Sequence, residues 1–126
     1  MSTDTDKLPT FVLRPPTDFW WPVRIPTASE GDYTYAKLDL LFAALPQPEL
    51  DKMQGIGLAE GERAPTDTEI ALRAVRGWRH MPDEHGNPVP FSEQALHQLL
   101  AHPMARLHIV ATFMAASNGL AARKNA

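Results

Sequence analysis

The chain contains no cysteine among its 126 residues. Disulfide bonds, thiol nucleophiles and thiolate metal sites are therefore excluded. An excess of basic charge is also missing, because 12 Lys and Arg residues stand against 15 Asp and Glu residues and leave a net charge of -3. Nucleic-acid binders rely on many Lys and Arg side chains that neutralise phosphates, so this mild acidity argues against nucleic acid as a partner.

Long apolar runs are absent too. No stretch of the sequence approaches the roughly 20 residues that a membrane helix needs. The polar, acidic start at Met1–Lys7 lacks the positive charge and apolar run of a signal peptide. Apolar residues still make up 44% of the chain, which is enough for a folded core. We therefore expect one small cytoplasmic domain over residues 1–126, with flexible tails at 1–10 and 119–126.

Two strands are predicted from a period of two in the apolar residues. Their inward faces are expected to carry Phe19, Trp21, Val23 and Ile25 on the first strand and Ala36, Leu38, Leu40 and Phe42 on the second. The polar, glycine-bearing segment 27–32 is expected to form the loop of this hairpin. Pro22 confines the first strand to a sheet edge or a bulge, and Phe11–Leu13 is a candidate third strand.

Helical patterns follow the hairpin. Pro48 suits the first position of a short helix that Gly55 and Gly57 end, and residues 54–65 are expected to be a flexible connection. Thr66 and Glu69 have the spacing of a capping box. The helix that they open is expected to bury a stripe of Ile70, Ala74, Val75 and Trp78.

Two more helices are predicted towards the C-terminus. Ser92 is the expected N-cap of a helix that carries Leu96, Leu99 and Leu100. Pro103 is expected to begin the last helix. An antiparallel β-hairpin or small sheet, followed by three to four helices, defines an α+β domain.

Residues 77–96, GWRHMPDEHGNPVPFSEQAL, gather His80, Asp83, Glu84 and His85, which invites a metal-site interpretation. Zinc sites usually need three or four ligands at recognised spacings, and HExxH is absent. The prolines and the Gly86–Asn87 pair instead favour a tight turn. We therefore interpret this segment as a structural corner between two helices, formed by Trp78, Asp83, Gly86, Pro88, Pro90, Phe91 and Ser92.

No catalytic, cofactor-binding or metal-binding residue is predicted. No Ser or Thr stands in a nucleophile elbow, and His97, His102 and His108 are interpreted as ordinary surface, boundary and core histidines. Arg73, Arg76 and Arg79 recur every three residues and are interpreted as a solvated helix face. The chain is expected not to be an enzyme, and a metal-dependent enzyme using His and Asp is the least favoured alternative.

The last helix is apolar nearly all round. A helix of this kind lies at the centre of a core or faces a partner, and both interpretations remain open. If the helix faces a partner, the candidate partner-binding residues are Met104, Leu107, Val110, Phe113 and Met114.

The corner motif resembles the tail assembly chaperones of long-tailed bacteriophages. The matching elements are Gly77-Trp78, the acidic turn from Asp83-Glu84 through Gly86, Pro88 and Pro90-Phe91-Ser92, and the Leu-rich helix after it. The likeness extends to the aromatic hairpin, to Leu45-Pro-x-Pro-Glu49 and to Arg123-Lys124-Asn125, so it covers roughly residues 11–125. The long connection at 54–65 departs from many relatives.

The resemblance implies a non-enzymatic protein of the bacterial host cytoplasm. Such a chaperone binds the tape measure protein, keeps it soluble while tail tube subunits assemble around it, and is absent from the mature particle. No cofactor, nucleic acid or membrane is implied, and a homo-oligomer is compatible with this function. The alternative is a structural tail-completion or connector protein that stays in the particle.

The codons of the last residues add a further expectation. Phage tail chaperones are often made in two lengths, because ribosomes slip back one nucleotide near the end of the short frame. Arg123-Lys124-Asn125 can be encoded through A-AAA-AAC or A-AAA-AAT, on which both tRNAs can pair again after the shift. The longer form is expected to recruit tail tube subunits; the alternative is an ordinary basic tail.

Overall fold

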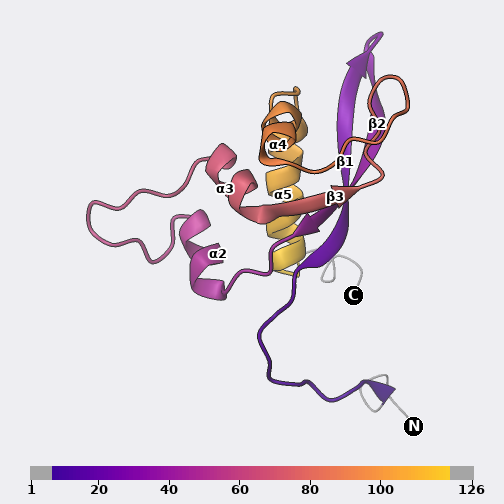
Figure 1. Cartoon of the computed structure of the whole chain (residues 1–126). Helices are drawn as coiled ribbons and strands as arrows, with labels where there is room; N and C mark the ends of the chain where they lie inside the picture. The colour runs from indigo at the N-terminus through magenta and orange to yellow at the C-terminus, as the bar shows by residue number, and fades with distance from the viewer. Residues whose placement is uncertain (1–6, 120–126) are drawn as a thin grey trace.

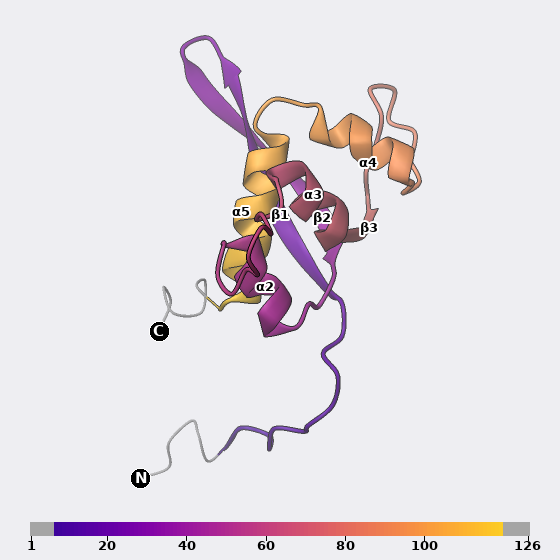
Figure 2. The ribbon, with the colours of Figure 1, turned by 90° about the vertical axis from the view of Figure 1, so that its left-hand side faces the viewer.

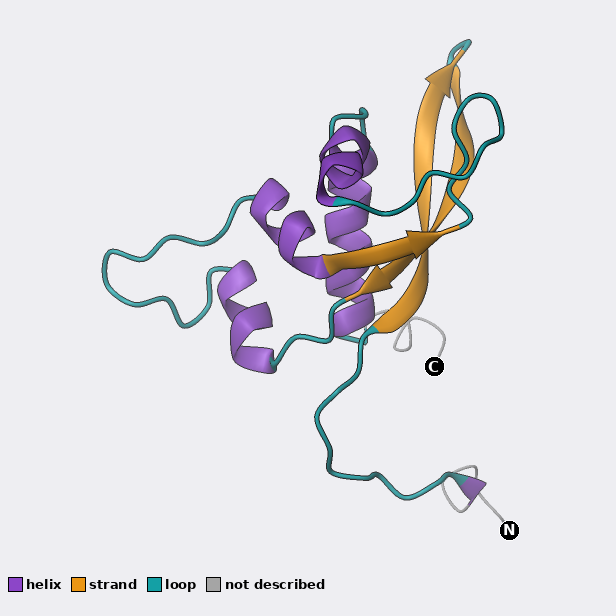
Figure 3. Ribbon diagram, in the orientation of Figure 1, coloured by secondary structure: helices purple, strands orange, loops and turns teal. Residues whose placement is uncertain are grey.

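The structure, a computed structural model, describes residues 7–119. Its elements are β1 (Phe19–Ser29), β2 (Asp32–Phe42), α2 (Gln47–Met53), α3 (Asp67–Ala74), β3 (Val75–Arg79), α4 (Glu93–Leu100) and α5 (Ala105–Ser117). The strands form an antiparallel sheet in the order β1-β2-β3. The predicted α+β class and the N-terminal hairpin are confirmed, although a third strand lies between α3 and α4 (Figures 1 and 3).

The hairpin is longer and its turn is tighter than expected. Glu30 and Gly31 both have left-handed φ values, 49° and 82°, as a two-residue type I′ turn requires. Ser29 and Asp32 already pair as strand residues, so most of the segment expected to be a loop belongs to the strands. The period of two is confirmed around Val23, because Val23 and Ile25 are buried while Pro22 and Arg24 on the opposite face are exposed; it ends at Pro26, which is also buried. β1 lies at the sheet edge, as Pro22 predicted.

The expected third strand was wrong. Phe11–Leu13 is exposed and forms no strand, and the third strand is instead β3, which pairs with Asp39–Phe42 of β2. The helix opened by Thr66 therefore ends at Ala74 and does not reach Trp78. Val75 adopts an extended conformation (φ -91°, ψ 117°), because a β-branched residue followed by Gly77 favours the pairing offered by β2 over one more helical turn.

The predicted helix ends are confirmed in three places. The end of α2 before Gly55 (φ 80°) is as predicted, while Pro48 is the second and not the first residue of this helix. The Thr66 side chain caps α3, and the Ser92 hydroxyl accepts a hydrogen bond from the Ala95 amide at 3.0 Å. These caps satisfy amides that the helices leave unpaired.

The predicted start of the last helix was wrong by two residues. Pro103 lies in a turn, and α5 begins only at Ala105 because Met104 takes a left-handed conformation with φ 69°. The chain bends by 106° between α4 and α5 there. Within the described residues no single helix is long and apolar enough to cross a membrane, and only the bent α4–α5 pair passes on length and composition.

The core lies between one face of the sheet and helices α3 and α5. Fully buried side chains from both layers include Val23, Leu40, Phe42, Ile109 and Phe113. The rings of Phe42 and Phe113 meet edge to face at 5.2 Å between centroids. The stripe of Ile70 and Ala74 on α3 is buried as expected, and Trp78 joins the same core from β3.

Candidate functional site

The segment with the titratable side chains is a structural corner, as predicted, but it joins β3 to α4 and not one helix to another. The Asp83 carboxylate accepts hydrogen bonds from the amides of His85 (2.8 Å) and Asn87 (2.9 Å). Gly86 has φ 82°, which favours glycine, and its amide donates to the Asp83 carbonyl. Pro82 pairs with Pro88 as an isolated bridge, so the segment closes on itself.

Trp78 anchors the corner to the core. Its indole Nε1 donates to the Val89 carbonyl at 2.8 Å, and the Phe91 ring meets it edge to face at 5.0 Å. Pro90, between these two contacts, holds the chain extended on its way to the Ser92 cap. The corner residues therefore fix the position of α4.

The histidines of the corner do not converge on a common point with several acidic groups. His80 and His85 are exposed, and His85 Nε2 lies 3.5 Å from Glu84 Oε1. The Asp83 carboxylate is already occupied by backbone amides. Over residues 7–119, no group of three or more His, Cys, Asp or Glu side chains is placed to hold a metal ion.

The three regularly spaced arginines do not share a helix face, because Arg76 and Arg79 lie on β3. Arg73 pairs with Glu49 through bonds of 2.7 and 3.2 Å and so fastens α3 to α2. The Arg76 Nε lies 3.6 Å from Asp18 Oδ2, and the Arg79 guanidinium lies 4.2 Å from the centre of the Trp20 ring. Each arginine therefore has a local partner, and no common anion site results.

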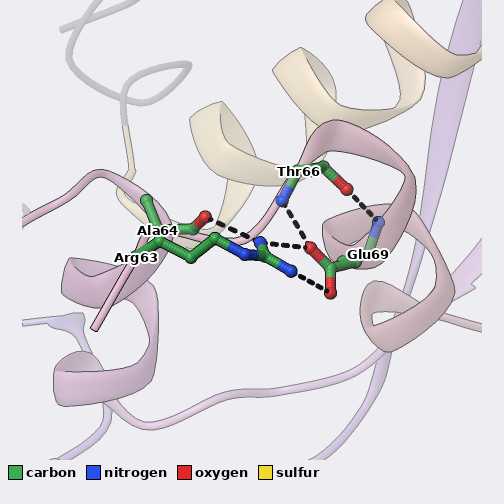
Figure 4. Close-up of polar contacts among 4 residues, drawn as sticks. All are labelled: Arg63, Ala64, Thr66 and Glu69. Carbon is green, nitrogen blue, oxygen red and sulfur yellow. Dashed lines mark hydrogen bonds and ion pairs between the residues drawn. The ribbon is translucent and has the colours of Figure 1, made fainter. Parts of the chain in front are cut away.

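The connection at 54–65 is fastened at its C-terminal end by a cluster of polar contacts (Figure 4). Arg63 Nη1 donates to Glu69 Oε1 at 2.8 Å, and the same carboxylate accepts from the Thr66 amide at 2.9 Å. The bond from Arg63, followed by those from Thr66, lowers the pKa of Glu69 to about 2. These contacts hold the start of α3 in place. Their role is structural, because none of the residues in the cluster supplies a reactive group.

An apolar groove lies between the hairpin and the turn at residues 101–104, which we call the α4–α5 turn. The hairpin tip projects beyond the helices (Figures 1 and 2). The groove has a volume of about 560 Å³. Its walls include Ile25, Ala36 and Leu38 on the hairpin and Leu99, His102 and Met104 on the other side.

The groove exists because the helical layer is shorter than the hairpin. Strands of 11 residues extend about 37 Å, whereas the 13 residues of α5 extend about 20 Å. The left-handed Met104 stops α5 from continuing along the sheet. The inner face of the hairpin therefore continues past the core, where Ile25 is buried, Leu38 is half-buried and Ala36 is exposed.

The candidate partner-binding residues differ in their exposure to solvent. Met104 lines the groove and is 41% exposed, and Leu107 is 53% exposed on the first turn of α5. Val110 and Phe113 lie in the core, with exposed fractions of 8% and 0%, while Met114 is partly buried. The last helix is thus a core helix whose N-terminal end faces outward.

The hairpin wall of the groove was not predicted from the sequence. Ile25, Ala36 and Leu38 were expected to be inward-facing, and nothing in their pattern shows that the helices stop short of them. The one available signal was a strand pattern longer than any helix that could cover it.

The chain was also compared with known proteins, and no family model, curated protein or solved structure matches it. A functional assignment therefore depends on the groove and on the motif resemblance of the corner.

Proposed function

We propose that the chain is a non-enzymatic tail assembly chaperone, which holds an apolar helix of a phage tape measure protein in the groove between the hairpin and the α4–α5 turn. The observation that carries the proposal is the apolar groove beside the core, whose hairpin wall consists of buried Ile25, half-buried Leu38 and exposed Ala36. A tape measure protein is a long helical chain with apolar stripes that aggregates when unprotected. An amphipathic helix laid into an apolar groove is a common way to bind such a chain.

The dimensions of the groove support a helical client. The strands exceed α5 by about 17 Å in length, and a helix with its side chains is about 10–12 Å across. One helix can therefore lie across the uncovered part of the hairpin beside the α4–α5 turn. Such a helix would extend the helical layer over the part of the sheet that α5 does not cover.

The chemistry of the walls supports an adaptable contact. Apolar side chains predominate, and Met104, with an unbranched and polarizable side chain, can repack against different client residues. A chaperone that slides along a long client needs this tolerance more than it needs a fixed pattern of hydrogen bonds.

Co-expression with the tape measure protein of the same genome tests the proposal. The wild-type chain should raise the soluble yield of that protein, and Ala36→Asp or Met104→Asp should remove the gain, because an unpaired charge is costly to bury. Aspartate tolerates the left-handed backbone of Met104 better than methionine does. Tyr35→Asp, on the opposite face of β2, is the matched control and should keep the gain. A wild-type chain that leaves the solubility unchanged would contradict the proposal.

A structural connector of the phage particle is the second candidate, and the exposed N-terminal segment favours it. Leu8, Phe11, Val12 and Leu13 are between 62% and 94% exposed, as is typical of a segment that clasps a neighbouring subunit. Mass spectrometry of purified particles separates the two candidates, since a connector is present there and a chaperone of the host cytoplasm is absent.

The longer form remains part of the proposal. The codons of Arg123-Lys124-Asn125, on which slippage depends, belong to residues outside the described part of the chain. If slippage occurs, residues 7–119 supply the client-binding groove and the added segment recruits tail tube subunits.

A further inference from the structure

Residues 8–13, which we call the N-terminal arm, carry apolar side chains that are mostly exposed. Phe11 is 86% exposed and Leu13 is 94% exposed. Within residues 7–119, no hydrogen bond or ion pair joins the arm to the folded domain. The first anchored residue is Asp18, whose Oδ1 accepts from the Ala44 amide at 3.0 Å. An apolar surface of this size on an extended segment calls for a partner.

The outer half of β2 has an open edge. β3 pairs only with Asp39–Phe42, and His80, with φ 57°, then turns the chain away from β2. In a two-residue hairpin the Ser29–Asp32 pair is hydrogen-bonded, so the backbone groups of Tyr35 and Lys37 face away from β1. No described residue forms a strand beside them. An open strand edge is a template for pairing with another chain.

The opposite edge of the sheet is closed to pairing. Pro22 and Pro26 pair with Asp39 and Tyr35 in the register that directs their nitrogens outward from β1. Proline has no N–H to donate, so a strand added along β1 would lose two of its hydrogen bonds. Of the two edges of the hairpin, the outer half of β2 is therefore the one available to the arm of another copy, and its residues Ala36 and Leu38 line the groove.

We propose that the chain forms a two-fold symmetric dimer in which residues 10–13 of each copy add a strand to the open β2 edge of the other copy. Phe11 and Leu13 then point to the same face of the sheet as Ala36 and Leu38 and cover the groove of the second copy. Such reciprocal exchange is self-complementary, as a two-fold interface must be.

The geometry of the arm favours a second copy over the arm's own domain. Pro15 and Pro16 hold the chain extended, and the arm leaves the base of β1 in the direction away from the hairpin tip (Figures 1 and 2). Residues 14–18 span at most about 17 Å. Two hairpins lying side by side in opposite directions place the tip of one beside the base of the other, within that reach.

The dimer has a consequence for the chaperone. Because the arm and a client helix would use the same groove, the dimer is the form without client, and client binding displaces the arm. Only this consequence rests on the proposed function; the dimer itself requires no client.

Light scattering after size-exclusion chromatography of the full chain, without client, tests the inference. The wild-type chain should be a dimer. The double variant Phe11→Asp/Leu13→Asp should dissociate roughly a hundredfold more readily, because it places charges in an apolar groove. It should melt like the parent under conditions where the parent is monomeric, since Phe11 and Leu13 are almost fully exposed in their own domain.

A matched pair of proline variants tests the edge. Lys37→Pro removes an outward donor from the open edge and should break the dimer, whereas Arg24→Pro, at the position paired with Lys37, acts on the closed edge and should leave it intact. Hydrogen exchange gives a second readout, in which the Tyr35 and Lys37 amides exchange more slowly in the wild type than in the arm variant. A monomeric wild-type chain, or a dimer that the arm variant leaves unchanged, would overturn the inference.

Discussion

Trp78 donates its indole Nε1–H to the carbonyl of Val89 at 2.8 Å, and this bond ties β3 to the segment that leads into α4. Only 9% of Trp78 is exposed. The indole therefore supplies both apolar contact to the core and a hydrogen bond that helps to fix the corner. Its role is structural.

Truncating this side chain should be costly. Trp78→Ala is expected to lower the free energy of unfolding by roughly 3–5 kcal/mol, because it removes buried apolar contact and leaves a cavity. Urea denaturation monitored by circular dichroism measures the loss. Trp20→Ala, which removes a 40% exposed ring from the outer face, is the control and should cost much less. Equal stability of Trp78→Ala and the parent would place Trp78 among the partner contacts.

The corner histidines should be dispensable for folding. His80→Ala and His85→Ala are each expected to leave the melting temperature largely unchanged, because both side chains are exposed and the turn is held by Asp83 and the backbone. Elemental analysis of the purified chain should find no stoichiometric zinc, nickel or manganese. A fold that melts on treatment with a chelator would refute the structural interpretation.

The Arg63–Glu69 pair should make stability depend on acid pH. Glu69 has a folded pKa of about 2, below its ordinary value of 4.5, so the unfolded chain takes up this proton first. Its contribution to stability is complete above about pH 4.5 and is lost as the pH falls towards about 2. Urea unfolding of the parent should therefore show a loss of stability between about pH 4.5 and about pH 2 that Glu69→Gln lacks.

Arg63→Gln is the companion variant for this prediction. Arg63 is the largest cause of the lowered pKa of Glu69, so the variant should raise that pKa and narrow the pH range over which stability is lost. The Thr66 capping contacts remain in this variant. Identical pH profiles for the parent and both variants would show that the pair is too solvated to matter.

The codon expectation is checked by reading the gene. Slippage requires A-AAA-AAC or A-AAA-AAT across the codons of Arg123, Lys124 and Asn125. An AAG codon at Lys124, or a minus-one frame that is closed downstream, would exclude it. Chaperone function of the short form does not depend on this result.

Local patterns in the sequence predicted local structure well. Three local features are present in the structure as predicted: the capping box of Thr66 and Glu69, the Ser92 cap and the alternation around Val23. Each depends only on neighbours a few residues away, so distant parts of the chain do not alter it. The turn at Asp83 belongs to the same class, because its side chain bonds to amides within four residues.

Features that depend on distant parts of the chain were mispredicted or missed. The apolar residues from Val75 to Trp78 fit a helical stripe. The segment nevertheless forms a strand, because its backbone can hydrogen-bond to β2. Met104 has no local reason to be left-handed; its conformation arises where α4 and α5 must bend by 106°. The groove follows from that bend, so its residues could not be assembled from sequence alone.

Photo-crosslinking from adjacent positions on β2 tests the central claim most directly. Benzoylphenylalanine is incorporated at Ala36, which lines the groove, or at Tyr35, which lies on the opposite face, and each variant is co-expressed with the tape measure protein. The account predicts a crosslink to the tape measure protein from Ala36 and none from Tyr35. A crosslink from Tyr35 alone, or from neither position while the client stays soluble, would contradict it.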